Sequence, residues 1–418
     1  MEWPDPFVRR MEAQFRESGT PDAFRAFLDS LDAPPSRGIR ANPLKVDPAA
    51  DFLTLLLRMA ADQSLAADPA SFPRVPWSPD GFFLPPGLMP GRHPLQATGI
   101  FYIQEPSAML PAAVLDPQPG ERILDLCAAP GGKTGRIAAA MSNWGLLVAN
   151  DLHADRVRAL VRNLELLGVS NTVVLNESPD RIARFLPDRF DRVLVDAPCS
   201  GEGMFRRDPD AVRSWKAYGP AACVPLQRGI LDAAWSALRP GGVLVYSTCT
   251  FSEEENEDQV LSFLDRHPDA RLDNLGAFAP GGPPDGMGPV ASRRLPETLR
   301  IWPHHRQDER RQGGDGHFCA RLVRLPEGPS PRPTDPPGSG QKPQRPSPAV
   351  LGVVRARLAE VLAPSSLSSL LEERVPALSI HGDHLHGLPE DAPDLRGLRI
   401  AKHGLHLGQV RTVRNGLR

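Results

Sequence analysis

Two cysteines lie fifty residues apart, and each follows an apolar run that predicts a buried strand. Cys199 stands in Asp196-Ala-Pro-Cys-Ser-Gly201, and Cys249 stands in Tyr246-Ser-Thr-Cys-Thr-Phe251. Side chains just beyond the carboxyl ends of parallel strands meet at one edge of a sheet, where α/β proteins bind their ligands. A thiolate is also a strong nucleophile when its electrophile is oriented. The pair therefore predicts covalent group transfer beside a cofactor.

A third apolar run, which begins at Arg122, leads into a glycine turn with the sequence Asp125-Leu-Cys-Ala-Ala-Pro-Gly-Gly-Lys-Thr134. The ending Gly-Lys-Thr invites a P-loop interpretation, but that motif requires glycine where this chain has Cys127. A glycine turn followed by an acid at the end of the second strand, here Asp151, favours a nucleotide-like cofactor whose ribose meets the carboxylate. A dehydrogenase would fit these two features as well.

The elements that must position these residues alternate along the middle of the chain. Strand-like runs at 122–126, 145–150, 172–175, 192–196 and 242–247 alternate with helical patterns at 133–141, 154–167, 226–238 and 255–266. This alternation predicts a mostly parallel, doubly wound α/β sheet with right-handed crossovers. Residues 317–324 alternate between apolar and polar side chains, and we expect them to add a late strand at the sheet edge.

Composition divides the chain into four parts. Residues 1–95 combine helical spacing with a short strand and are expected to form a leading domain, which the core at 96–325 follows. Residues 326–349 are rich in proline and poor in apolar side chains, so they predict a linker without a packed core. Residues 350–418 then form a C-terminal module, whose segment 396–418 holds six basic residues and no acidic one and predicts phosphate contacts.

Charge and cysteine content exclude several classes of protein. The formal net charge of −2 gives no overall attraction to nucleic acid, so such binding would depend on local patches. Five cysteines without CxxC spacing predict no disulfide framework, and the histidines at 381, 384 and 386 lack cysteine partners, so no metal is expected. No run is apolar enough for a membrane span or a signal core, which predicts a cytoplasmic protein that binds no membrane. The protein is also expected to be a monomer.

Three segments resemble, in order, the motifs of the Sun-type RNA (cytosine-5) methyltransferase family. They are the glycine turn at 125–134, Asp196-Ala-Pro-Cys-Ser-Gly-Glu-Gly-Met-Phe205 and Ser247-Thr-Cys-Thr-Phe-Ser-Glu-Glu-Glu-Asn256. Within the family, the chain is most similar to the bacterial 16S ribosomal RNA methyltransferase F group, and the resemblance includes Tyr102-Ile-Gln-Glu-Pro-Ser107. It implies a Rossmann-like class I methyltransferase core that uses S-adenosylmethionine, a small N-terminal α+β RNA-binding domain and a C-terminal PUA-like RNA-binding module.

The resemblance also assigns roles to the residues at the strand ends. It implies that Cys249 attacks C6 of a flipped-out cytosine, that Cys199 assists removal of the C5 proton and release of the enzyme, and that Asp196 and Lys133 hold the base. The residues alone leave the two thiols open as alternatives. DNA cytosine methyltransferases use a Pro-Cys nucleophile on the equivalent strand, and Pro198-Cys199 fits that pattern too.

A cofactor site along the ends of the first three strands is implied in the same way. Many family members carry an aspartate near the end of the third strand that faces the adenine amino group. This chain has Ser178 there, with Asn176, Glu177 and Asp180 as alternatives. The residues expected to contact S-adenosylmethionine are Cys127, Ala128, Ala129, Pro130, Gly131, Gly132, Lys133, Asp151, Arg156, Ser178 and Asp196.

Three functions are compatible with these features. The resemblance favours C5 methylation of cytosine in small-subunit ribosomal RNA or in an assembly intermediate of that subunit. Transfer RNA is the alternative acceptor for the same chemistry. A protein that only binds RNA during ribosome assembly would keep the fold and the basic segment, but it would have no need for Cys199, Cys249, Asp196 and the glycine turn, all of which are intact.

Overall fold

The computed structural model describes most of the N-terminal and central parts of the chain and shorter stretches of its C-terminal part. The described residues are 3–278, 289–308, 311–312, 314–326, 346–360, 362, 377–381, 383–388, 392–395, 397–410, 412–413 and 416–417. Most of the linker predicted at 326–349 lies outside them, as do four of the six basic residues in 396–418. The predicted domain boundaries stay predictions.

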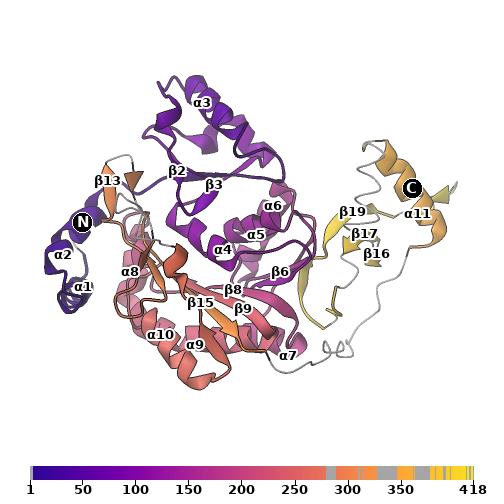
Figure 1. Cartoon of the computed structure of the whole chain (residues 1–418). Coiled ribbons are helices and arrows are strands. Elements are labelled where there is room, and N and C mark those ends of the chain that lie inside the picture. The colour runs from indigo at the N-terminus through magenta and orange to yellow at the C-terminus, as the bar shows by residue number, and fades with distance from the viewer. Residues whose placement is uncertain are drawn as a thin grey trace.

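A ten-stranded mixed sheet forms the centre of the molecule (Figure 1). Five of its strands are parallel and run in the order β7-β6-β5-β8-β9. Their bounds are β5 (Arg122–Asp125), β6 (Leu146–Asn150), β7 (Thr172–Leu175), β8 (Phe190–Asp196) and β9 (Leu238–Thr248). Because the order reverses beside β5, the ends of β5, β6 and β8 border the crevice where doubly wound sheets bind ligands. The predicted fold class is confirmed.

Antiparallel strands extend the sheet on both sides. β15 (His317–Arg324) pairs with β9 on one side and with β12 (Leu299–Ile301) and β10 (Ala270–Leu272) on the other. β11 (Val290–Ala291) pairs with β12. The prediction that 317–324 forms an edge strand is therefore wrong. The strands that cover it have only two or three residues, which is too few for a detectable alternation in the sequence. At the far side, β18 (Ile400–Lys402) pairs with β7, so the predicted C-terminal module contributes a strand to the core.

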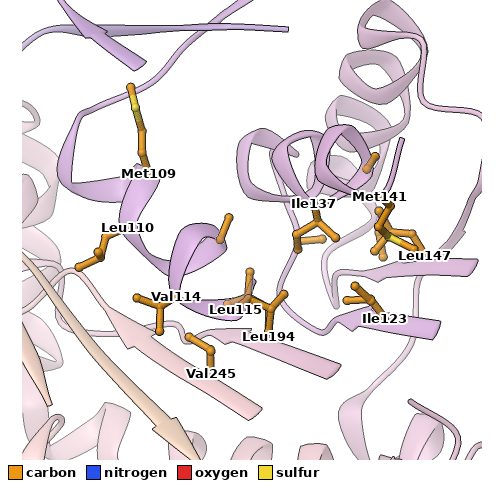
Figure 2. Close-up of a cluster of buried hydrophobic side chains, with 14 of the residues drawn as sticks. Met109, Leu110, Val114, Leu115, Ile123, Ile137, Met141, Leu147, Leu194 and Val245 are labelled. Atoms are coloured by element: carbon orange, nitrogen blue, oxygen red, sulfur yellow. The ribbon is translucent and has the colours of Figure 1, made fainter. Parts of the chain in front are cut away.

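Helices cover both faces of the sheet, and each layer buries an apolar cluster. One layer holds α4 (Leu110–Leu115), α5 (Gly132–Ala140) and α6 (Ala154–Leu167). The opposite layer holds α7 (Pro179–Phe185), α9 (Gly219–Ala237) and α10 (Glu257–Arg266). In Figure 2, Val114 and Leu115 of α4 and Ile137 of α5 lie over the strand residues Leu194 and Val245. Burial on two faces explains why these strands are continuous apolar runs in the sequence.

The N-terminal part contributes two separate units. α1 (Asp5–Glu17) and α2 (Pro21–Asp32) pack through Phe7, Phe15 and Phe27 against Phe205 and Phe251 of the core. A small antiparallel sheet in the order β2-β3-β1-β4 packs on α3 (Phe52–Asp62). Its strands are β1 (Gly38–Ala41), β2 (Arg74–Val75), β3 (Ser78–Phe83) and β4 (Phe101–Ile103). Figure 1 shows this sheet above the core and α1 and α2 beside it.

The C-terminal part holds α11 (Pro348–Ala359) and an antiparallel sheet of β16 (Ala377–His381), β17 (His384–Leu388) and β19 (Leu405–Gln409). These elements lie on the side of the core away from α1 and α2 (Figure 1). Within the described residues, no helix combines the length and the apolar character that crossing a membrane would require.

Candidate active site

The two strand-end cysteines meet at the carboxyl edge of the sheet. β8 and β9 are parallel neighbours with Asp196 opposite Ser247, so the segments that follow them leave the sheet side by side. The sulfur atoms of Cys199 and Cys249 lie 3.4 Å apart. Residues fifty positions apart in the sequence therefore share one site, as the parallel arrangement of their strands predicts.

A buried carboxylate ties the two cysteine segments together. Glu255 accepts hydrogen bonds from the backbone N–H of Ser200 (2.9 Å), from the Ser200 hydroxyl and from the Gln227 amide (2.8 Å). The hydroxyls of Ser200 and Thr250, which follow the two cysteines directly, are 2.8 Å apart. Burial raises the pKa of Glu255 above its ordinary value, and the hydrogen bonds it accepts only partly offset this. These bonds fix the separation of the two thiols.

Asp196 lies at the end of β8 among three partners. Its carboxylate is 2.7 Å from the Lys133 ammonium and accepts a 2.9 Å hydrogen bond from the Ser247 hydroxyl, while the His317 ring nitrogen Nε2 is 3.6 Å away. Burial alone would raise the pKa of Asp196, but Lys133 and His317 outweigh burial and hold the pKa well below its usual range. Asp196 is therefore a carboxylate throughout the neutral pH range.

Lys133 joins this carboxylate to the thiols. Burial alone would lower the pKa of Lys133, but the charges of Asp196 and then Cys249 outweigh burial, so the pKa lies above its ordinary value. The ammonium is 13% exposed and the Asp196 side chain is 29% exposed, so the pair is only partly screened by water.

The two thiols differ in their surroundings. The hydrogen bond with Cys249, followed by burial, raises the pKa of Cys199 well above its ordinary value. The two thiols share a hydrogen bond in which either sulfur can be the donor. Burial also raises the pKa values of Cys127 and Cys319, and it raises the pKa of Cys223 to about 12. The residue pattern left the roles of Cys199 and Cys249 open, and their assignment stays a prediction.

The glycine turn connects β5 to α5 in a conformation that needs glycine. Gly131 has a φ of +108° directly before the first turn of α5, in the region that side chains disfavour. At Gly132 a Cβ would lie 2.7 Å from a ring carbon of Tyr102 in β4, so a side chain there would displace the ring. The backbone N–H of Ala128 donates to the carbonyl of Asn150 (2.7 Å), which holds the turn against the end of β6.

The two carboxylate oxygens of Asp151, which lies beside this turn, have different surroundings. Oδ1 accepts a hydrogen bond from the backbone N–H of His153 (3.0 Å). Oδ2 is buried and has no hydrogen-bond partner among the described residues, although an Arg156 nitrogen lies 3.2 Å from it. Arg156 also donates to the carbonyl of Ala129 (2.7 Å). A buried carboxylate oxygen that lacks a donor fits the hydroxyl groups of a cofactor ribose.

The residues near the end of β7 divide into two groups. The Asn176 amide donates to the carbonyls of Asp151 and Leu152, both at 2.9 Å. The Glu177 side chain is fully buried and accepts hydrogen bonds from Arg181 (2.9 Å) and from the backbone N–H of Arg399 (2.8 Å). Both side chains thus make hydrogen bonds within the protein that stabilise the fold. Ser178, which precedes α7 without a side-chain capping bond, and Asp180 in the first turn stay the predicted adenine contacts.

Sequence reasoning missed the groups that hold the predicted site residues in place. Glu255 is one of three consecutive glutamates, and nothing in Glu253-Glu254-Glu255 marks which of them is buried. His317 reaches Asp196 only because β15 pairs with β9, and the sequence predicted the strand but placed it at the edge. Only the Ser247 hydroxyl carried a usable signal, because residues at the carboxyl ends of adjacent parallel strands lie beside the same crevice.

Asp125 at the end of β5 predicts a measurable dependence of stability on pH. Burial raises its pKa to about 7 despite a 2.7 Å hydrogen bond from the Thr134 hydroxyl. A raised carboxyl pKa means that the folded state loses stability as pH rises from about 4 to about 7, by at most about 4 kcal/mol. We expect Asp125→Asn, which keeps an acceptor for Thr134 but cannot ionise, to raise the melting temperature relative to wild type at pH 8 more than at pH 5. Parallel melting-temperature profiles for the two proteins would contradict this expectation.

The order of the parallel strands, the glycine turn after β5 and the acid after β6 define a doubly wound fold for a nucleotide-like cofactor. The antiparallel strand β15 beside β9 makes the sheet mixed, which is typical of the class I methyltransferases that use S-adenosylmethionine. The family model "16S rRNA methyltransferase RsmB/F" matches residues 112–323. The chain belongs to this family. Models of the N-terminal domain of 16S rRNA methyltransferase RsmF and of the first C-terminal domain of RsmF match residues 3–106 and 367–414.

Individual relatives agree with this assignment. Ribosomal RNA small subunit methyltransferase F of Salmonella paratyphi A is 38% identical over 331 residues, a match that covers 77% of this chain and 64% of that protein. A methyltransferase homologue from Pyrococcus horikoshii has a solved structure that is 29% identical, with a TM-score of 0.57 over 76% of this chain and 99% of that one. NSun6 from the same organism, at 22% identity, shares the fold with a TM-score of 0.62 and covers 78% of this chain and 99% of that one.

Proposed function

We propose that the protein methylates C5 of cytosine in 16S ribosomal RNA through a covalent bond between Cys249 and C6 of the base. S-adenosylmethionine supplies the methyl group. The observation that carries the proposal is the pair of thiols 3.4 Å apart next to the Lys133–Asp196 ion pair, at the carboxyl ends of β8 and β9. Covalent activation explains both thiols, because C5 of cytosine is a weak nucleophile until a group adds at C6. The names of the relatives, such as ribosomal RNA small subunit methyltransferase F, support ribosomal RNA as the acceptor.

The ion pair holds the target base. An ionised Asp196 accepts a hydrogen bond from the exocyclic amino group of cytosine, and the Lys133 ammonium donates to an acceptor on the same ring edge. These two groups distinguish cytosine from uracil, which presents an acceptor where cytosine presents its amino group. The base must leave its stack to reach them, which costs a few kcal/mol in duplex RNA and least in loops. The expected targets are therefore unpaired or incompletely assembled regions.

The two cysteines act at successive stages. The Cys249 sulfur bonds to C6, which makes C5 a carbon nucleophile that takes the methyl group. The proton on C5 must then leave, and its bonding electrons expel the Cys249 thiolate and restore the ring. Cys199, whose sulfur is 3.4 Å from that of Cys249, lies where it can assist this proton removal. The C5 proton passes to the Cys199 sulfur, which reacts as a thiolate at this step.

The cofactor site predicts a specific loss of affinity. Asp151 offers one free carboxylate oxygen, and hydrogen bonds to charged groups contribute about 1.5–3 kcal/mol each. We expect Asp151→Ala to weaken S-adenosylmethionine binding by about 10-fold to 100-fold in isothermal titration calorimetry. Asp155→Ala is the matched control, because Asp155 is exposed in the first turn of α6 and pairs only with Arg158 at the surface. Equal affinities for the two variants would contradict the assignment of Asp151.

Labelled methyl transfer to RNA tests the proposed function directly. Small ribosomal subunits, 16S RNA stripped of protein and total transfer RNA serve as parallel acceptors, and bisulfite sequencing then locates any C5-methylated cytosine. Incorporation into 16S RNA or its subunit is the expected result. Incorporation into transfer RNA alone would change the acceptor but keep the chemistry. No incorporation would favour a protein that only binds RNA.

RNA-binding roles for residues 1–95 and 350–418 belong to the same proposal, but one predicted phosphate contact needs correction. Lys402 is 7% exposed, and its ammonium donates to the carbonyl of Val169 (3.2 Å) in the core. It stabilises the pairing of β18 with β7 and is not available to a phosphate. Arg399, whose side chain is 65% exposed, lies 3.5 Å from the Glu177 carboxylate and keeps most of its surface in water.

A further inference from the structure

A basic, aromatic pocket lies between the N-terminal helices and the strands beyond the active site. We call it the arginine pocket, and the residues that matter for its chemistry are Phe15, Arg293, Arg294, Trp302, His304 and His305. Its volume is about 230 Å³. A buried cavity of about 150 Å³ is enough to hold a benzene ring, so this pocket has room for a single nucleobase.

The charges around the arginine pocket leave one arginine free to bind an anion. Arg300 is buried and forms an ion pair with Glu257, with its Nε 2.7 Å from a carboxylate oxygen. Arg294 pairs with Glu253 (3.1 Å) and with Asp258 (2.5 Å). Arg293 is exposed, donates to the backbone carbonyl of Ser18, and has no carboxylate partner in the described part of the chain. Its guanidinium is the group that a phosphate would meet.

Aromatic and polar groups in the pocket suit a nucleobase. Trp302 stacks on Phe251, with centroids 5.4 Å apart and ring planes at 8°, and the Arg300 guanidinium lies over the Trp302 ring, 5.2 Å from its centroid. The rings of Phe15 and His304 are tilted against Trp302, at centroid distances of 5.4 Å and 5.7 Å. The Nδ1 atom of His305 is buried without a hydrogen-bond partner among the described residues. Bases stack on such aromatic surfaces with little regard to sequence, and a buried imidazole nitrogen offers them a hydrogen bond.

Part of the pocket is formed by the segment that follows the proposed nucleophile. Phe251, the stacking partner of Trp302, is two residues after Cys249, and Glu253 of the same segment lines the pocket. An Arg300 nitrogen donates to the Phe251 carbonyl (3.2 Å), which fixes this segment against β12. The segment that carries the proposed nucleophile therefore also contributes to the arginine pocket.

We propose that the arginine pocket binds the nucleotide next to the target cytosine, with its base against the aromatic residues and its phosphate at Arg293. This inference rests on the proposed function, because it takes single-stranded RNA as the ligand. The pocket supplies the enzyme with a second base-binding site, so a flipped cytosine is held together with one unstacked neighbour. It also gives α1 and α2 a part in substrate binding, since Phe15 belongs to α1 and Ser18 follows it.

The test compares Arg293→Glu with Arg184→Glu in the full-length protein, on the RNA that the wild-type protein methylates. Arg184 is exposed in the last turn of α7, which leads back toward the amino ends of the strands, so it is a matched charge change away from the cysteines. We expect Arg293→Glu to raise the Kd for RNA about 10-fold and to lower the salt slope of binding by about 1, with unchanged affinity for S-adenosylmethionine. Arg184→Glu should leave all three quantities at wild-type values.

A second arm tests the base rather than the phosphate. A synthetic RNA fragment centred on the methylated cytosine carries an abasic site at its 5′ or its 3′ neighbour, and one of the two should lose about 5-fold or more in affinity. Equal effects of Arg293→Glu and Arg184→Glu, or no loss with either abasic RNA, overturn the inference while methylation of the unmodified RNA stands. If the wild-type protein methylates no RNA, the proposed function fails and the inference fails with it.

Discussion

Cys249→Ala is expected to lose methyl transfer by about 10⁴-fold or more and to form no covalent adduct with RNA that contains 5-fluorocytosine. The adduct is diagnostic because fluorine at C5 cannot leave as a proton does, so the enzyme stays bonded to C6. Denaturing electrophoresis reports this bond as a protein band shifted by the RNA. The expectation rests on the proposed role of Cys249 and on its sulfur lying 3.4 Å from the Cys199 sulfur, next to the Lys133–Asp196 ion pair.

Cys199→Ala should give the opposite pattern. Attack at C6 still proceeds, but removal of the C5 proton slows, so ordinary cytosine RNA accumulates as a covalent complex and turnover falls. Cys223→Ala is the matched control, because Cys223 in α9 belongs to neither strand-end segment and its pKa is raised to about 12 by burial and by Glu255. If the Cys249→Ala protein forms the covalent complex with RNA and the Cys199→Ala protein does not, the two cysteines have the opposite roles.

Asp196→Asn is expected to lower kcat/KM for RNA about 10³-fold. The substitution keeps the shape of the side chain and an acceptor for Ser247, but it removes the charge that the Lys133 ammonium balances at 2.7 Å. Lys133 then becomes a partly buried cation without its carboxylate, so its pKa falls and its field at Cys249 weakens. The base would lose its acceptor, and the nucleophile would lose its supporting charge.

Ser247→Ala is the control for this expectation, because it removes only one neutral hydrogen bond to Asp196. Such a bond contributes about 0.5–1.5 kcal/mol, so the loss in kcat/KM should stay within about 10-fold. Steady-state kinetics of the two variants, together with their melting temperatures, separate a catalytic defect from a folding defect. If Asp196→Asn retains kcat/KM within about 10-fold of wild type, the charge of Asp196 is not part of the reaction.

The pH profile of the wild-type enzyme follows from the same ion pair. The folded-state pKa of Asp196 is depressed, so its contribution to stability is present above its unfolded value of about 4 and is lost only as pH falls through the folded value. Protonation of Asp196 therefore does not limit activity above about pH 4. If activity falls with decreasing pH at a value above about 4, the titrating group is not Asp196, and we expect it to belong to the cysteine chemistry.

The sequence predicted the catalytic core well because its signals are local. The apolar runs that end at Leu126, Asn150 and Asp196 became β5, β6 and β8, since strands buried on both faces must be apolar throughout. The helical pattern at 154–167 gave α6 with identical bounds. The glycine turn was recognisable because a positive φ at Gly131 restricts the residues that fit there. Family resemblance then supplied the proposed roles of Cys199 and Cys249.

Contacts between distant segments were not predictable in the same way. Two-residue and three-residue strands such as β11 and β12 are too short for a periodic pattern, so the strand at 317–324 was placed at the edge. Lys402 reads as part of a basic surface in the sequence, yet β18 buries it against β7. The role of Arg293 depends on which neighbouring arginines already have carboxylate partners, and those partners come from α10 and from the segment after β9.

By itself, the sequence determined that two thiols, a carboxylate and a glycine turn would stand at the ends of buried parallel strands. Local composition dictates those strands, and their parallel arrangement brings their ends to one edge. Only the tertiary structure decided how close these groups lie. It placed the two sulfur atoms 3.4 Å apart and paired Lys133 with Asp196 at 2.7 Å. Reactivity depends on the electric field of groups that lie close in space, and sequence order does not encode that proximity.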